Sequence, residues 1–173
     1  KKLADRCHEA GVRCYLMMPR IFRKEAEQYF RKQMELLTSA GFDALGIGSM
    51  EEPGFLREAG IELPMYFDQG MYSWNHLAGA AMERYGADRL TIPVELNERE
   101  IRDSGVQGEM IVYGYLPMMI SAQCIRKTTL GCSGKSEIMW LKDRKDMRFP
   151  VVNQCRFCYN TIYNSAPLSL LGL

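Results

Sequence analysis

The segment DALGIGSMEEP (43–53) decides the fold, because it joins a short apolar stretch directly to the start of a helix. DALGIGS (43–49) is predicted to be a strand. Glu51, Glu52 and Pro53 follow, and proline fits a first helical turn because the N–H it lacks would have no helical partner there. This step from strand to helix predicts a parallel sheet with helical crossovers.

The same step recurs on both sides of this segment. The predicted strands are VRCYLMMP (12–19), ELPMYFDQG (62–70), RLTIPVEL (89–96) and EMIVYGYLP (109–117). The predicted helices are 22–39, ended by Gly41; 73–87, with Ser73 as N-cap; and 97–105, between Asn97 and Gly105. Repeated units of this kind are typical of α/β proteins.

Five strands are too few for an eight-stranded barrel of about 250 residues, but they suit the second half of one. An open doubly wound sheet is the competing architecture. The chain opens on Lys1 in what resembles the tail of a helix, without an initiator methionine. We therefore expect a fragment of a longer chain that lacks the N-terminal half of the barrel.

The pattern changes after Pro117. Residues 121–136 are polar and contain glycine and cysteine, which predicts a loop, and 137–152 predict a β-hairpin with DRKD at its turn. The last residues, from Tyr159, are expected to form a helix. The predicted fold is thus α/β, the second half of a TIM-like (β/α) barrel (1–117) with a C-terminal cysteine-bearing β-hairpin module (118–173).

Composition gives limited guidance on partners. The chain has 22 basic and 21 acidic side chains, a net charge of +1, which gives no global argument for nucleic acid. No apolar run approaches the roughly 20 residues that span a bilayer, so no membrane partner is expected. The six cysteines are unevenly spread, unlike a secreted disulfide framework, which favours a reducing, cytoplasmic setting.

Four of these cysteines lie close together in the last third of the sequence. They are Cys124, Cys132, Cys155 and Cys158, in CIRKTTLGC and CRFC, among glycine, basic and amide residues. Four thiolates can close a tetrahedral zinc site or hold an iron–sulfur cluster. The alternatives are four unrelated thiols or, less favoured, a thioredoxin-like CxxC. We expect metal or cluster ligation.

Other candidates are polar residues at strand ends and a group of cations. Glu95 and Asp68 each lie at the C-terminal end of a predicted strand, where a barrel carries its functional residues, and could serve as acid or base; a solvated carboxylate is the ordinary alternative. Arg126, Lys127 and Lys135 lie between the cysteines and could bind an anionic small molecule or RNA, although such runs are usually only solvated.

One stretch resembles a known family. EMIVYGYLPMMISAQC (109–124) is similar to the signature of the collagenase-like peptidases, peptidase family U32, with a glutamate, an apolar strand, a glycine and a cysteine. RLTIPVELNEREI (89–101) resembles the preceding strand of that family and LKDRKDMRFPV (141–151) its closing hairpin. The resemblance covers roughly residues 10 to 170 and implies a TIM-type barrel.

The resemblance implies two kinds of activity. Members were named as peptidases, some of them for collagen, whereas others are implicated in hydroxylating RNA bases or a quinone precursor without molecular oxygen. In those, four cysteines hold a [4Fe–4S] cluster and prephenate is the oxygen source. Cys124 corresponds by position to a cluster ligand. This sequence departs from the pattern at Pro117, where many members carry another cysteine.

Three functions follow from these observations. The first is an enzyme of RNA or cofactor modification that holds a [4Fe–4S] cluster, or alternatively zinc, on the four cysteines. The second is a metal-dependent peptidase acting on a peptide substrate, although four thiolates saturate zinc and leave no open catalytic position. The third is a structural zinc module that binds RNA or a protein.

Overall fold

The computed structural model describes residues 2–172, which divide after Ile111 into two compact units. Unit 1 contains the residues up to Ile111 and unit 2 those from Val112 onward. This division lies close to the boundary predicted at Pro117. Among the described residues, no helix has the length and apolar character that crossing a bilayer requires.

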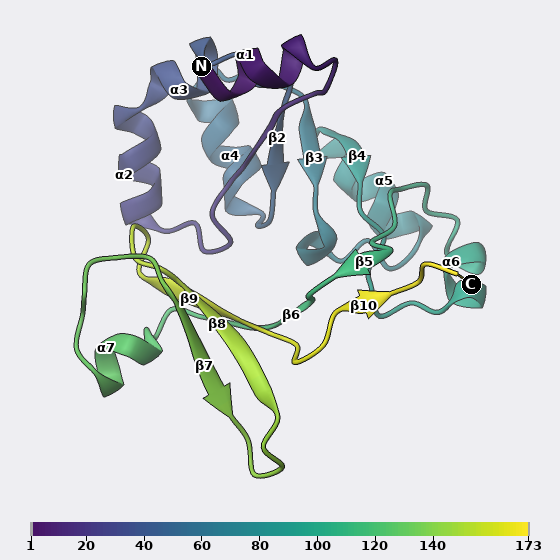
Figure 1. Cartoon of the computed structure of the whole chain (residues 1–173). Coiled ribbons are helices and arrows are strands. Elements are labelled where there is room, and N and C mark those ends of the chain that lie inside the picture. Colours follow the sequence, from purple (N-terminus) through teal and green to yellow (C-terminus); the bar gives the residue numbers. More distant parts are fainter. Residues whose placement is uncertain (1, 173) are drawn as a thin grey trace. The chain divides into compact units, whose positions relative to one another are not determined.

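Unit 1 is a parallel α/β unit, as predicted. Its four strands are parallel and follow the chain order β1–β2–β3–β4; Figure 1 labels β2, β3 and β4 of this sheet. A doubly wound sheet reverses its strand order, so consecutive order favours a barrel-type winding; closure into a barrel stays a prediction. The elements are α1 (Lys2–Glu9), β1 (Tyr15–Met17), α2 (Lys24–Lys32), α3 (Met34–Ser39), β2 (Ala44–Ile47), α4 (Glu51–Glu58), β3 (Met65–Phe67), the 3₁₀ turn η1 (Gln69–Met71), α5 (His76–Arg84), β4 (Ala87–Leu90) and α6 (Glu98–Ser104).

The core of unit 1 lies on one face of this sheet. Leu45, Ile47 and Phe67 are completely buried. Between β1 and α2, the Phe22 ring centroid lies 5.1 Å from that of Phe55 and 6.2 Å from that of Phe30. Burial of such side chains supplies the main driving force that holds helices against a sheet.

Several predicted boundaries differ from the structure for identifiable reasons. Strands β3 and β4 are shorter than expected, because Pro64 and Pro93 have no N–H to donate to a sheet ladder. The N-cap of α5 is Asn75 and not Ser73, because the Asn75 side chain accepts a 3.0 Å hydrogen bond from Ala78 N. The predicted helix 22–39 is broken at Gln33, and nothing in the local sequence explains this break.

Unit 2 is antiparallel. Its main sheet has the order β6–β9–β8–β7, and β5 pairs with β10 (Figure 1). The predicted hairpin is present as β7 and β8. The elements are β5 (Tyr113–Gly114), β6 (Pro117–Ser121), α7 (Ile125–Thr129), β7 (Ile138–Lys142), β8 (Arg148–Gln154), β9 (Tyr159–Tyr163) and β10 (Leu168–Ser169).

Two sequence predictions fail here. Residues 109–117 do not add a fifth parallel strand: Glu109 makes one isolated bridge to Thr91, and the chain then enters unit 2. The expected C-terminal helix is instead β9 and β10. Tyr159, Thr161 and Ile162 are aromatic or β-branched, and such residues favour a half-buried sheet over a helix.

Helix α6 provides a test of local stability. Asn97 accepts a 3.0 Å hydrogen bond from Glu100 N, and the Glu100 side chain accepts a 2.8 Å bond from Asn97 N, which completes a capping box. Asn97→Ala is therefore expected to lower the free energy of unfolding by about 1 kcal/mol in chemical denaturation. Asn97→Ser, which keeps a side-chain acceptor, should retain most of that free energy. Equal losses in both variants would contradict the role of Asn97 as the N-cap of α6.

Candidate functional site

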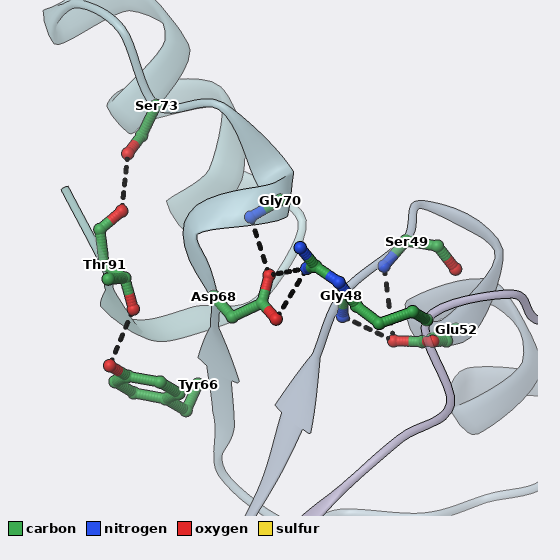
Figure 2. A network of polar contacts seen from close by, with 9 residues as sticks. Gly48, Ser49, Glu52, Tyr66, Asp68, Gly70, Ser73 and Thr91 are labelled. Atoms are coloured by element: carbon green, nitrogen blue, oxygen red, sulfur yellow. Dashed lines mark hydrogen bonds and ion pairs between the residues drawn. The ribbon is translucent and has the colours of Figure 1, made fainter. Parts of the chain in front are cut away.

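The carboxyl ends of β1, β2 and β3 hold a polar network in unit 1 (Figure 2). Asp68, directly after β3, accepts hydrogen bonds from Arg20 Nη1 at 2.5 and 2.7 Å and from Gly70 N at 2.7 Å. Arg20 follows β1, and both side chains are largely buried, at 21% and 16% exposure. This ion pair therefore joins the ends of two strands that are not neighbours in the sheet.

Two glycines make room for the Arg20 side chain. A Cβ at Gly70 would overlap Arg20 Nη1, and a Cβ at Gly48 would lie 3.0 Å from Arg20 Cδ and 3.5 Å from Asp68 Oδ2. A side chain at Gly70 would therefore displace the guanidinium from its position beside Asp68, and one at Gly48 would require a smaller shift of the arginine. The GIGSM stretch contributes Gly48 to an arginine cradle in this structure.

Glu52 is the second carboxyl at this edge and is completely buried. Its Oε2 accepts hydrogen bonds from Gly48 N at 2.8 Å and Ser49 N at 3.4 Å, as Figure 2 shows, while Oε1 has no hydrogen-bond partner within the described residues. Burial raises the pKa of Glu52 to about 8, with a smaller contribution from the charge of Asp68. At neutral pH this carboxyl is thus mostly protonated.

The network has a structural role and a chemical capability. Ser49-x-x-Glu52 is the sequence pattern of a capping box, and the Glu52 side chain does bond back to the chain before α4. The same arrangement places a neutral carboxyl near an ion-paired one. Two carboxyls held in different protonation states are the usual provision for acid–base chemistry.

A second chain of hydrogen bonds runs through the neighbouring strands. Ser73 Oγ donates to Thr91 O at 3.2 Å, Thr91 Oγ1 donates to Tyr66 Oη at 2.6 Å, and Tyr66 donates to Glu109 at 3.3 Å. Burial raises the pKa of Tyr66, and Glu109 raises it further. The tyrosine is therefore a proton donor and not a base at neutral pH.

The two carboxylates predicted from sequence have different surroundings. Asp68 is at the centre of the network with Arg20. Glu95 lies on an exposed turn between Pro93 and α6, and its side chain makes no ion pair within residues 2–172. The structure therefore does not bring Glu95 and Asp68 into one hydrogen-bonded group.

The four cysteines all belong to unit 2 and are free thiols. Cys124 precedes α7 as its N-cap, and Cys132 lies in the exposed loop between α7 and β7. Cys155 and Cys158 follow the returning strand of the β7–β8 hairpin and occupy the four-residue turn between β8 and β9. Cys158 has a left-handed backbone, with φ of 56°.

Hydrogen bonds bring the loop and the turn together. The Cys155 thiol donates to Lys135 O at 2.9 Å, and Cys155 N donates to Ser136 Oγ at 3.3 Å. Burial raises the pKa of Cys155, and the negative charges of Cys132, Cys124 and Cys158 raise it further. The other three cysteines therefore lie near enough to influence the pKa of Cys155, although among the described residues no three His, Cys, Asp or Glu side chains are close enough to hold a metal ion.

The predicted cations have different environments. Arg126 forms an ion pair with Glu137 at 2.5 Å and is only 22% exposed. Lys127 and Lys135 are exposed. Of these three cations, the two lysines are thus the ones that present their charge to solvent.

Arg20 and Glu52 belong to the polar edge but were not predicted from sequence. The capping-box spacing from Ser49 to Glu52 was a signal available in the sequence. No local pattern could identify Arg20, because its partner lies 48 positions away along the chain.

Comparison with known proteins gives the family. The sequence profile of peptidase family U32 matches residues 1–167, so the chain belongs to this family. The fold is similar to that in "The Structure of the U32 Peptidase Mk0906", with a TM-score of 0.50 and 16% identity over 66% of this chain and 51% of that one. The chain therefore spans about half the length of that solved relative. No protein with a curated description matches it.

The buried Glu52 carboxyl gives a testable pH dependence. Between pH 4.5, its ordinary pKa, and about 8, the folded chain keeps a proton that the unfolded chain releases, so stability falls as pH rises. The slope from this group approaches about 1.4 kcal/mol per pH unit. In Glu52→Gln, denaturant titrations at different pH values should no longer show this fall in the free energy of unfolding between pH 4.5 and about 8. The exposed neighbour Glu51→Gln is the control, and identical slopes for Glu52→Gln and the unmodified chain would contradict the assignment.

Proposed function

We propose that this chain is the cofactor-bearing part of a U32-family enzyme that acts in the oxygen-independent hydroxylation of RNA or of a cofactor precursor. Cys124, Cys132, Cys155 and Cys158 would hold a [4Fe–4S] cluster, with zinc as the alternative metal. The observation that carries the proposal is that Cys155 and Cys158 share one turn of unit 2, and that hydrogen bonds from Cys155 to Lys135 and Ser136 hold the loop after Cys132 beside that turn. A cytoplasmic setting, as expected from the cysteine pattern, would keep these thiols reduced.

The chemistry of this donor set fits the cofactor. Four thiolates are the usual ligands of [4Fe–4S] clusters and of structural zinc. Bringing the sulfurs together without a cation is electrostatically unfavourable, and a bound cation reverses that effect. Cys132 lies in a loop without regular secondary structure, where the backbone can adjust on loading.

The chain's own residues would bind and orient the reactants. Cys155 is tied to the Lys135 carbonyl, which keeps the loop with Cys132 beside the turn. Lys127 and Lys135 would attract an anionic small molecule or an RNA phosphate, while Arg126 stays paired with Glu137. When bound, a cluster supplies one-electron redox chemistry.

The first test is the metal and sulfide content of the chain purified without oxygen. Iron and sulfide together, with broad absorption at roughly 400 nm, are the expected result. Replacing the four cysteines by serine should abolish both, whereas serine at Cys7 and Cys14, which lie in unit 1, should leave both unchanged. Stoichiometric zinc in a colourless sample would favour the structural zinc module, and no metal at all would overturn the proposal.

A second candidate is hydrolysis of peptides, as the family name implies. The observation that favours it is the pair of carboxyls at the sheet edge, with Glu52 neutral and Asp68 paired with Arg20. Hydrolysis needs a group that gives a proton and another that accepts one. This edge could supply both without any contribution from the cysteines.

Mutants separate the two candidates. A peptidase of this kind should lose gelatin hydrolysis by about 100-fold in Glu52→Gln or Asp68→Asn and keep it in the four-cysteine variant. Glu95→Gln tests the remaining carboxylate predicted from sequence, with Glu98→Gln on α6 as its control. Loss of hydrolysis in the cysteine variant, with Glu52→Gln unaffected, would reject the carboxyl mechanism.

A further inference from the structure

Two asparagines flank the turn that carries Cys155 and Cys158. Asn153 lies two positions before Cys155 on β8, and Asn160 lies two positions after Cys158 on β9. The two asparagines are directly paired in the antiparallel register. Directly opposed residues point to the same face of a sheet, so both side chains lie on one face at the base of the cysteine turn.

Both side chains are completely buried yet only partly satisfied. Within residues 2–172, both polar atoms of the Asn153 amide and Nδ2 of Asn160 have no hydrogen-bond partner. Leaving buried polar groups without partners is unfavourable, and apolar side chains would fill this space more stably. Packing alone therefore does not explain why amides occupy these two positions.

In the part of the chain that the structure describes, the one side-chain hydrogen bond of this pair leads to another cysteine-bearing segment. Asn160 Oδ1 accepts a 2.8 Å hydrogen bond from Ile125 N. Ile125 directly follows Cys124 and is the first residue of α7. A single buried side chain thus connects the segment of Cys124 to the turn of Cys155 and Cys158, although 35 positions separate the two residues in the sequence.

We infer that Asn160 is a positioning residue for the cysteine site, which fixes Cys124 relative to the Cys155–Cys158 turn through the backbone of Ile125. This inference rests on the proposed function. Residues that orient metal ligands without touching the metal commonly change metal affinity 10- to 100-fold when they are replaced. The acceptor oxygen of Asn160 is the atom that matters, and the size of the side chain is secondary.

Cobalt binding tests this role without any enzymatic assay. The reduced chain is titrated with Co²⁺ under anaerobic conditions, and absorption from thiolate–cobalt bonds reports the dissociation constant. Asn160→Ala, which removes the acceptor, should weaken Co²⁺ binding by about 10- to 100-fold. Asn160→Asp keeps an oxygen at the same place and should stay within about threefold of the unmodified chain. Asn164→Ala is the matched control, because among the described residues Asn164 Oδ1 accepts hydrogen bonds from its neighbour Ser165 alone.

A second measurement separates positioning from a general effect on folding. The rate of Cys124 alkylation by iodoacetamide in the metal-free chain should change in Asn160→Ala and remain unchanged in Asn160→Asp and Asn164→Ala. If Asn160 had only a structural role, Asn160→Asp would be disturbed more than Asn160→Ala, because a buried carboxylate destabilises a fold more than alanine does. The inference is supported if Asn160→Asp keeps its affinity for Co²⁺ and Asn160→Ala loses it, although Asn160→Asp is the less stable of the two variants.

The outcomes are distinguishable. If the unmodified chain binds no Co²⁺, the four-cysteine site and the role of Asn160 are both overturned. If the unmodified chain binds Co²⁺ and Asn160→Ala binds it equally well, the inference alone fails and the proposed site stands. Equal weakening in Asn160→Ala and Asn164→Ala would also overturn it, since the effect would then not depend on the contact with Ile125.

Discussion

The carboxyl edge of the sheet in unit 1 is organised by the ion pair between Arg20 and Asp68. In a parallel sheet the loops at the carboxyl ends of the strands have few backbone partners, so side chains must organise them. Here one guanidinium passes over Gly48 and reaches the carboxylate after β3. Because this pair is mostly shielded from solvent, breaking one side would leave a buried charge uncompensated, which is strongly destabilising.

The candidate functional groups are held in position differently in the two units. In unit 1 the candidate groups follow strands of one sheet, so the alignment of the strands sets their spacing. In unit 2 the cysteines lie on a turn, a helix start and a loop, which few contacts hold. A thiolate site can be built this way because metal binding itself supplies free energy for ordering its ligands.

Much of unit 1 could be predicted from sequence because its signals are local. The apolar run of 43–49, the proline in the first turn of α4 and the caps of α6 each determine structure within a few residues. Predictions failed where distant partners decide the outcome. Ser73 is a plausible cap by residue type, but its hydroxyl bonds to the Thr91 carbonyl, and Glu109 forms only one bridge before the chain leaves the sheet. For the candidate sites, the grouping of cysteines in the sequence indicated those residues and the end of a strand indicated Asp68, whereas Arg20 and Asn160 become visible only through contacts between remote segments.

The backbone of Cys158 has one more consequence. A residue with φ of 56° lies in the left-handed region, where glycine is the least strained choice and any residue with a Cβ raises the energy of the turn. The β8–β9 turn would thus close more easily with glycine at this position, and the chain instead carries a sulfur there. If that sulfur is a ligand, the metal-free turn is less stable than the same turn with glycine would be. Binding of the cofactor and folding of the turn then become one coupled equilibrium.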